Sequence, residues 1–250
     1  PPRGATTSQA PPRHIDASPA RLLEALARRV APVESSYAAL WHDKEQLATR
    51  LHDDYIARIG WCDLKAFSLI LPVIPAGTAL QLSNGTTVRY AQLFNTPQVS
   101  RSDCNRGVCG IDGSTSTAAG ASCVGDETTL FITGDMSFSY DANGLSSAYL
   151  SPRFKVIVMC NGGGGIFRFI KPTAGLPELE RCFEVHRDIP VEKYADLFGL
   201  RYFEIDSEAS AAEVLPRFFA ENERPAILAV HTPHLYNAEV LRGYFRRARQ

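Results

Sequence analysis

The sequence predicts an α/β fold, in which a parallel sheet is flanked by helices on both faces. Short, strongly apolar segments at 129–133, 155–159 and 225–230 have the composition of buried strands. They alternate with longer segments whose apolar residues recur at helical spacing. This alternation is typical of a parallel sheet, because each crossover between parallel strands needs a long connection that is usually a helix.

Size and composition are those of an ordinary globular protein. The chain has 250 residues, of which 45% are hydrophobic and 21% are charged, and its net charge is −1. That charge gives no reason to expect nucleic acid or an anionic membrane as a partner. No apolar run reaches the length of a bilayer span, and the first residues lack the apolar core of a signal peptide. We therefore expect a cytoplasmic protein that does not bind membranes.

The six cysteines favour the same compartment. No Cys-x-x-Cys pair occurs, which argues against a zinc site. Cys104 and Cys109 are near enough in sequence to form a disulfide. We expect free thiols instead, because disulfides are rare in the cytosol.

The amino-terminal part differs in composition from the rest. Residues 1–17 are rich in Pro, Ser and Thr, as linkers are. We expect residues 1–36 to be a linker with the end of a preceding domain, and residues 37–250 to form the main domain. Proline and apolar spacing predict three helices in this part of the chain, none with evident catalytic chemistry, at 20–30, 37–59 and 63–71.

A change of pattern at residue 79 marks the start of the sheet. A buried-type strand at 79–83 is followed by a turn and a helix at 88–94, and such a helix start suits anionic groups. Residues 95–112 are predicted to be a long loop, which in a compact domain is usually functional or disordered. The small residues of 113–121 suit a helix packed tightly on the sheet.

The carboxyl-terminal part continues the alternation. Several turns and helix-ending residues divide it into short elements. The predicted elements are a lid-like segment at 171–190, a helix at 191–198, a strand at 202–205, a helix at 210–220, a strand at 225–230 and a helix at 238–249.

Polar side chains follow two of the predicted strands. Asp135 comes just after the strand at 129–133, and Asn161 just after the strand at 155–159. Their separation, 161 − 135 = 26 residues, suits one strand–helix–strand crossover. Because parallel strands end at one edge of a sheet, we expect Asp135 and Asn161 to lie side by side. With the bare backbone of residues 162–165 they offer hard oxygen ligands, which suit Mg²⁺.

Other interpretations of these residues stay open from spacing alone. Asp135 can cap the helix that follows it. The glycine run at 162–165 can be a flexible turn, since it fits neither a dinucleotide-binding fingerprint nor a P-loop.

The same residues resemble a known cofactor motif. Gly134-Asp135, followed by Asn161 and Gly163, is similar to the diphosphate and metal motif of thiamine diphosphate enzymes. The resemblance implies that Asp135, the Asn161 side chain and the Gly163 carbonyl bind Mg²⁺ or Mn²⁺. It also implies that the residues around Asp135 contact the cofactor, namely Gly134, Met136 and Ser137. At two positions the chain departs from the usual motif, with Met136 in place of glycine and Cys160 in place of asparagine.

A longer set of motifs resembles one branch of these enzymes, the 2-succinyl-5-enolpyruvyl-6-hydroxy-3-cyclohexene-1-carboxylate synthases of menaquinone biosynthesis. The residues are Ser83-Asn84-Gly85 with Arg89, the segment Asn-Arg-Gly-Val-Cys-Gly-Ile-Asp-Gly at 105–113, and Ser-Thr-Ala-Ala-Gly at 116–120. The resemblance implies a transferase that decarboxylates 2-oxoglutarate and adds the resulting carbanion to isochorismate.

The resemblance also assigns roles within residues 79–170. Arg89 and Arg106 would bind the substrate carboxylates, as planar guanidinium groups do well. Ile111 would be an apolar wedge that holds the cofactor bent, beside the carbonyl of Gly110. The remaining roles are contact with diphosphate or substrate for Ser83, Asn84 and Gly85, the last replacing a serine usual in the family, and lining of the substrate pocket for Ile166 and Phe167.

Simpler roles stay open for some of these residues. Arg106 can instead form a surface ion pair with Asp103 or Asp112. Phe167 and Phe169 can be plain core residues.

Family resemblance further implies that a pyrimidine-binding domain carries the activating glutamate elsewhere in a longer chain. Residues 37–250 would then be the diphosphate- and metal-binding domain, inactive alone, and the full-length protein a homodimer or homotetramer. Two alternatives remain: another thiamine diphosphate carboligase of the acetolactate-synthase type, or a non-catalytic α/β binding module.

Overall fold

The computed structural model of the protein describes residues 15–220 and 223–247. The predicted linker at 1–17 therefore lies mostly outside the described residues, as does the end of the predicted last helix. The chain divides into two compact units, residues 1–47 and residues 48–250. The first contains helix α1 (Pro19–Ala27), which begins with a proline in its first turn, and the first part of helix α2 (Tyr37–Arg58). The boundary predicted after residue 36 stays a prediction.

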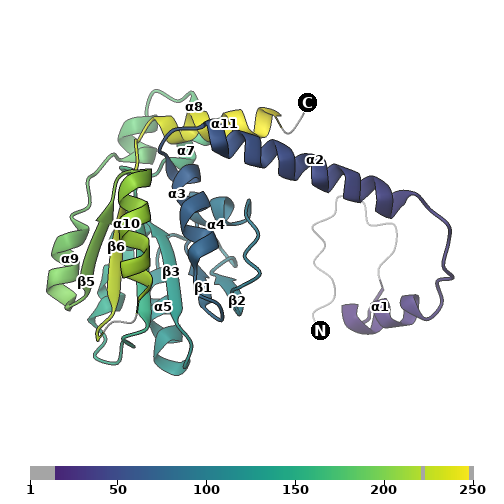
Figure 1. The fold of residues 1–250 in the computed structure, drawn as a ribbon, viewed down its shortest axis with the longest axis horizontal. Coiled ribbons are helices and arrows are strands. Elements are labelled where there is room, and N and C mark those ends of the chain that lie inside the picture. The colour runs from purple at the N-terminus through teal and green to yellow at the C-terminus, as the bar shows by residue number, and fades with distance from the viewer. Residues whose placement is uncertain (1–14, 221–222, 248–250) are drawn as a thin grey trace. The chain divides into compact units, whose positions relative to one another are not determined.

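The second unit is built on a six-stranded sheet, with every neighbouring pair of strands parallel (Figure 1). The strands lie in the order β2-β1-β3-β4-β6-β5. Their bounds are Ala79–Leu82 (β1), Arg101–Cys104 (β2), Thr129–Gly134 (β3), Phe154–Cys160 (β4), Arg201–Ile205 (β5) and Ala226–His231 (β6).

Helices cover both faces of the sheet, so the predicted fold class is confirmed. On one face lie α3 (Asp63–Ile70), α4 (Thr86–Ala91), α10 (Glu208–Phe219) and α11 (Tyr236–Arg247). On the other face lie α5 (Ser114–Val124), α6 (Asp135–Asp141) and α9 (Val191–Phe198). The shorter elements are α7 (Ile166–Phe169), α8 (Lys171–Ala174), the π-helical turn η3 (Leu179–Glu184), and the 3₁₀ turns η1 (Leu71–Val73) and η2 (Ala142–Ser146).

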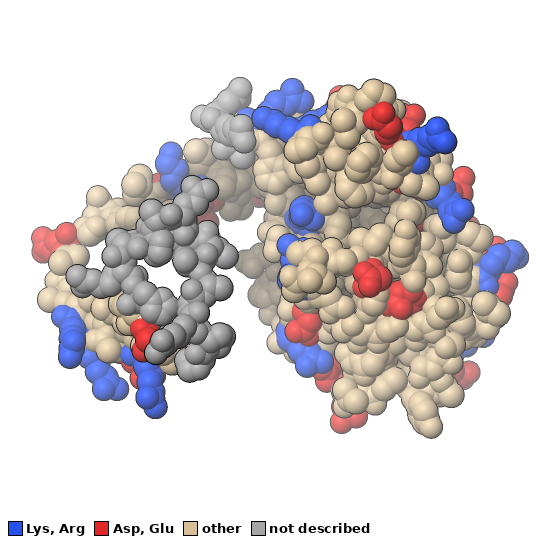
Figure 2. All heavy atoms as spheres, turned by 180° about the vertical axis from the view of Figure 1, so that it is seen from behind, with Lys and Arg blue, Asp and Glu red and all other residues tan. Residues whose placement is uncertain are grey.

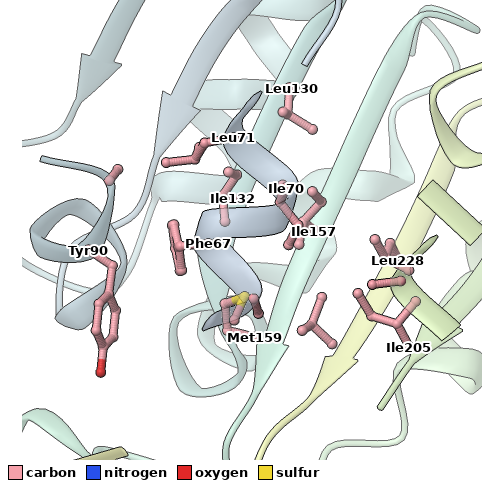
Figure 3. Close-up of a cluster of buried hydrophobic side chains, with 14 of the residues drawn as sticks. Phe67, Ile70, Leu71, Tyr90, Leu130, Ile132, Ile157, Met159, Ile205 and Leu228 are labelled. Carbon is pink, nitrogen blue, oxygen red and sulfur yellow. The ribbon is translucent and has the colours of Figure 1, made fainter. Parts of the chain in front are cut away.

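Alternation along the central strands divides the core into two layers. In β4, Ile157 packs on the α3 side while Val156 and Val158 pack on the α5 side. Figure 3 shows the first layer, in which Phe67 of α3 lies over side chains of β3 and β4. Strands buried on both faces need apolar residues at successive positions, which explains the continuous apolar runs in the sequence.

One strand was not predicted. Residues 95–112 contain the edge strand β2, which pairs with β1 alone. Its residues Arg101, Ser102 and Asp103 are exposed, so the segment has no apolar pattern to mark it as a strand. Likewise the predicted lid-like segment at 171–190 is partly helical, in α8 and η3.

The strand order places the site. The chain passes from β1 outward to β2 and then returns to form β3 on the other side of β1. In open parallel sheets, ligands bind outside the carboxyl ends of the strands at such a reversal. The turns after β1 and β3 therefore flank the expected crevice.

The surface carries charges of both signs. On the face drawn in Figure 2, acidic and basic side chains are interspersed over the domain, in keeping with a net charge of −1. Among the described residues, no helix combines the length and apolar character needed to cross a membrane.

Candidate functional site

A cleft of about 510 Å³ opens at the carboxyl edge of the sheet. It is formed by the turns that follow β1, β3 and β4, together with α7 and η3. The predicted site residues that line it are Asn84, Gly85, Arg89, Arg106, Ile111, Gly134, Asp135, Met136, Ser137, Asn161, Gly163, Ile166 and Phe167. The structure thus brings together residues from four separate stretches of sequence.

Two predicted residues do not line this cleft. Ser83 directly follows β1, and its side chain is fully buried, with Oγ donating to the carbonyl of Asn84 at 3.3 Å. Gly110 turns its carbonyl to Nδ2 of Asn84, which donates to it at 2.6 Å. The Gly110 carbonyl therefore fixes the loop after β2 to Asn84, and its second lone pair can accept another hydrogen bond.

Asp135 is the first residue of α6 and is buried at the end of β3. Its Oδ1 atom accepts from the backbone N–H of Met136 at 2.7 Å. Its Oδ2 atom accepts from the N–H groups of Gly162 and Gly163, at 2.8 and 3.0 Å. Gly134 holds the N-cap position, so Asp135 is not the N-cap residue. The carboxylate instead links the turn after β3 to the turn after β4. The sequence predicted that these two turns lie side by side.

Burial controls the charge of Asp135. Desolvation raises the pKa of its carboxyl group to about 7, although three backbone N–H donors act in the opposite direction. The nearby carboxylate of Asp63 raises the pKa further. A cation bound beside Asp135 would favour the ionised carboxylate, and the ionised carboxylate would in turn attract the cation.

Asn161 follows β4 and is also buried. Its Nδ2 atom donates to Oδ2 of Asp63 at 2.8 Å, and its backbone carbonyl lies 2.9 Å from Nδ1 of His234. Its Oδ1 atom is buried and has no hydrogen-bond partner among the described residues. Buried polar atoms nearly always have a partner, so this acceptor is free to take one from a ligand or a water in the cleft.

The glycine loop between β4 and α7 depends on its lack of side chains. Gly162 and Gly163 have φ values of 82° and 126°, which other residues rarely adopt. A Cβ atom on Gly163 would also collide with the carbonyl of Glu184. The N–H of Gly164 donates to that same carbonyl at 2.8 Å, so η3 holds the loop in place.

The turn η3 is itself anchored by a buried charge. Glu184 is fully buried and accepts from Nε of Arg168 at 2.7 Å. His234 Nε2 lies 3.4 Å from the same carboxylate. These contacts tie η3 to α7 and to the turn after β6.

The available donors fit a hard cation. Among the described residues, no group of three or more His, Cys, Asp or Glu side chains could hold a metal ion. A metal here would depend on one carboxylate, Asp135, with the amide oxygen of Asn161 and the backbone carbonyl of Gly163. Oxygen ligands with few charges suit Mg²⁺, which keeps water and phosphate oxygens in its shell. The unpaired Oδ1 of Asn161 is the observation that supports this fit.

Two arginines lie on the opposite part of the cleft lining. Arg106 donates from Nη1 to Oδ1 of Asn84 at 2.8 Å, rather than pairing with Asp103 or Asp112. Asp103 instead pairs with Arg101 at 3.4 Å. Arg89 donates to the carbonyl of Gly85, one turn earlier. Neither arginine has a carboxylate partner within the described part of the chain, so both can bind acidic groups.

The apolar part of the lining comes from α7 and η3. The rings of Phe167 and Phe183 lie 5.4 Å apart, beside Ile166. Phe169 packs instead against the core and Phe245, with a ring separation of 5.9 Å. The core role therefore applies to Phe169, while Phe167 lines the cleft. On the loop after β2, Ile111 is held by its carbonyl, which accepts from Oγ of Ser137 at 2.6 Å.

Some lining residues were not predicted from the sequence. They are Thr86, Thr87, Cys109, Tyr140, Ile170, Cys182, Phe183 and Val185. The two threonines could have been found from their place just after Gly85, at the start of α4. The lining residues of η3 could not be found from their position in the sequence, because a π-helical turn has no regular apolar spacing. All six cysteines are free, as predicted.

The fold and the cleft together define a class of protein. An all-parallel α/β domain with a cleft at the switch point of its sheet belongs to the class of proteins that bind ligands outside the carboxyl ends of the strands.

Comparison with known proteins makes the class specific, although no family model matches the chain. A relative from Porphyromonas gingivalis is 46% identical over 226 residues, covering 90% of this chain and 39% of the relative. One from Christiangramia forsetii is 40% identical and covers 78% of this chain and 34% of the relative. One from Flavobacterium psychrophilum is 36% identical and covers 94% of this chain and 42% of the relative.

All three relatives are named 2-succinyl-5-enolpyruvyl-6-hydroxy-3-cyclohexene-1-carboxylate synthase. The chain is therefore a homologue of these synthases, and the family predicted from its motifs is confirmed. It spans about 34–42% of the length of these relatives.

Proposed function

We propose that this chain is the diphosphate- and metal-binding domain of a thiamine diphosphate-dependent synthase of menaquinone biosynthesis. The enzyme would decarboxylate 2-oxoglutarate and join what remains to isochorismate. The observation that carries the proposal is the junction of Asp135 and Asn161 at the carboxyl edge of the sheet, where Oδ1 of Asn161 has no partner.

The residues of the junction would hold the metal and the diphosphate. Asp135, Oδ1 of Asn161 and the carbonyl of Gly163 would bind Mg²⁺ or Mn²⁺. Gly134, Met136 and Ser137, at the start of α6, line the cleft where the diphosphate would lie. Thiamine diphosphate, when bound, would supply a nucleophilic carbon that adds to the 2-oxo group and a positively charged ring that takes up the electron pair released by decarboxylation.

The other side of the cleft would select the substrates. Arg89 and Arg106 carry positive charges at a site where 2-oxoglutarate and isochorismate both bring carboxylates. Ile166 and Phe167 supply an apolar wall. Small apolar 2-oxo acids, the substrates of acetolactate-type carboligases, carry one carboxylate each and would not need both arginines, which disfavours that alternative.

Ile111 would keep the cofactor in place as an apolar wedge. Its backbone is fixed by Ser137. Because Ser137 belongs to α6, the same helix that begins at Asp135, the wedge and the metal ligand share one support.

Further partners belong to the same proposal. The activating glutamate would come from a pyrimidine-binding domain outside this sequence, in keeping with the greater length of the relatives. The full-length protein would be a cytoplasmic homodimer or homotetramer, and this chain alone would be inactive.

A substrate panel on the full-length protein tests the proposal. With thiamine diphosphate and Mg²⁺ present, CO₂ release should be fastest from 2-oxoglutarate and should depend on isochorismate. Pyruvate should be a poor donor, because it lacks the second carboxylate that the arginines would bind. Preference for pyruvate would contradict the assignment and favour an acetolactate-type carboligase.

A further inference from the structure

A second buried carboxylate contacts the Asn161 amide. Asp63 is the first residue of α3, and its Oδ2 atom accepts from Nδ2 of Asn161 at 2.8 Å, across a sequence separation of 98 residues. Asp63 is not needed to form the α3 helix cap, since Cys62 occupies that position. A carboxylate buried to this extent needs a reason, because burial of an isolated charge is costly.

The polarity of the hydrogen bonds around Asp63 can be deduced from one backbone group. The backbone N–H of Asp63 can only donate, and it donates to Oδ1 of Asn237 at 2.8 Å. Nδ2 of Asn237 is then the atom that faces Oγ1 of Thr232, to which it donates at 3.1 Å. The Thr232 hydroxyl in turn directs its proton to Oδ1 of Asp63, at 2.6 Å.

The same reasoning fixes the Asn161 amide. Asp63 is an acceptor toward Thr232, and its other oxygen faces Asn161. With the Asp63 carboxylate ionised, an Asn161 amide turned by 180° would place its oxygen against a carboxylate oxygen, with no proton between them. The NH₂ end must therefore face Asp63, and the oxygen must face away from it. That oxygen is the buried atom without a partner in a residue that lines the cleft.

We propose that Asp63 is a positioning residue for the metal ligand Asn161: by holding the NH₂ end of the amide, it presents the oxygen to the cation. The inference rests on the proposed function, since it requires a metal at Asn161. Asp63 contacts Asn161 directly and is not among the residues that line the cleft. Partners of this kind orient metal ligands, and their loss typically lowers metal affinity about 10–100-fold.

The substitution Asp63→Asn tests this with almost no change of shape. Thr232 can still donate to the remaining oxygen at position 63, so the introduced NH₂ group faces Asn161. Asn161 must then turn its oxygen toward position 63 and its NH₂ group toward the metal. We expect the dissociation constant of Mn²⁺ to rise about 10–100-fold in the full-length protein with saturating thiamine diphosphate. Free Mn²⁺ is measured by electron paramagnetic resonance, independently of turnover.

A reversed pair separates positioning from a merely structural role. In Asp63→Asn/Asn161→Asp, the introduced NH₂ group donates to the introduced carboxylate, whose other oxygen is free for the metal. We expect Mn²⁺ affinity to return at least to the wild-type value. A residue that only stabilised the fold would change the melting temperature of Asp63→Asn without changing its Mn²⁺ affinity, so the two measurements together separate the roles. If Asp63→Asn alone does not fold, the Mn²⁺ affinity of the double variant still tests whether Asp63 positions Asn161.

A matched control is Asp43→Asn, the same chemical change at an exposed position of α2, which should leave Mn²⁺ affinity unchanged. Wild-type affinity in Asp63→Asn overturns the role of Asp63 and leaves the proposed function standing. A reversed pair that folds with the wild-type melting temperature and binds weakly also overturns it. Failure of the wild-type protein to bind Mn²⁺ with thiamine diphosphate overturns the proposed function and this role together.

Discussion

The two ends of strand β4 bury polar side chains in different ways. Near the amino end, Nζ of Lys155 donates to the carbonyls of Phe218 and Ala220 at 2.7 and 2.9 Å. It also lies 5.4 Å from the centre of the Phe218 ring. Just beyond the carboxyl end, Asn161 is also buried, but its Oδ1 atom has no hydrogen-bond partner in the described part of the chain.

The difference separates a structural group from a binding group. Lys155 donates to carbonyls at the end of α10, a part of a helix whose carbonyls have no intrahelical donors. Within the described residues the Asn161 oxygen lacks a donor, and an unpaired buried acceptor costs about 1–3 kcal/mol, so we propose that a ligand occupies it. The open end is the carboxyl end of the sheet, where parallel sheets bind ligands.

The largest effect is expected at the carboxyl end, from Asp135→Ala. The metal would lose its only charged protein ligand. We expect Mg²⁺-dependent affinity for thiamine diphosphate to fall more than about 100-fold, beyond the loss typical of an outer partner. Calorimetric titration measures it, with the exposed Asp126→Ala as a control that should bind normally. Unchanged affinity in Asp135→Ala would remove Asp135 from the site.

At the amino end, pH should reveal the buried ammonium group. Burial lowers the pKa of Lys155 from 10.5 to about 8, and Arg201 acts in the same direction. Between pH 8 and 10.5, Lys155 is protonated in the unfolded chain and largely deprotonated in the folded chain. The free energy of unfolding therefore rises with pH over this range.

The size of this effect follows from the same two values. The two pKa values differ by 10.5 − 8 = 2.5, which at about 1.4 kcal/mol per unit gives at most about 3.5 kcal/mol. Urea unfolding of wild type and Lys155→Met across this pH range measures it, because the difference between the two proteins isolates the lysine. A difference that does not change with pH would contradict a buried Lys155.

Arg106→Ala tests whether the cleft separates substrate from cofactor. A hydrogen bond to a charged group contributes about 1.5–3 kcal/mol, so we expect the KM for 2-oxoglutarate to rise about 10–100-fold. Affinity for thiamine diphosphate should stay near normal. Arg101→Ala, on the exposed edge strand β2, is the control. A large loss of cofactor affinity would instead assign Arg106 to the diphosphate.

The smallest predicted effect compares two glycines of one loop. Gly163→Ala should lower the free energy of unfolding by about 1–3 kcal/mol, because of its positive φ and the nearby Glu184 carbonyl. Gly165 has a φ of −53° and open space around it, so Gly165→Ala should change stability by less than about 1 kcal/mol. Equal effects in thermal or urea unfolding would show that the loop is not held by η3.

The central strands and the polar residues that follow them could be predicted because short stretches of sequence identify each of them. The central strands are continuous apolar runs, and Asp135 and Asn161 each follow one directly. Parallel pairing then places both at one edge, whatever the details of the helices. The adjacency of Asp135 with Gly162 and Gly163 confirms that part of the argument.

Other features depend on contacts that no local pattern shows. The edge strand β2 is polar because only one neighbour pairs with it. Asp63 has the sequence of an ordinary helix start, and it becomes part of the site only when Asn161, Thr232 and Asn237 converge on it from elsewhere in the chain. Convergence of this kind is a property of the tertiary structure.

Titration of thiamine diphosphate into the full-length protein, with and without Mg²⁺, tests most directly whether the open end of β4 is a metal and diphosphate site. We predict heat of binding with Mg²⁺ and little without it, because Asn161 and Asp135 would contact the cofactor through the cation. Equal binding in the presence of a chelator, or no binding under either condition, would contradict this account of the site.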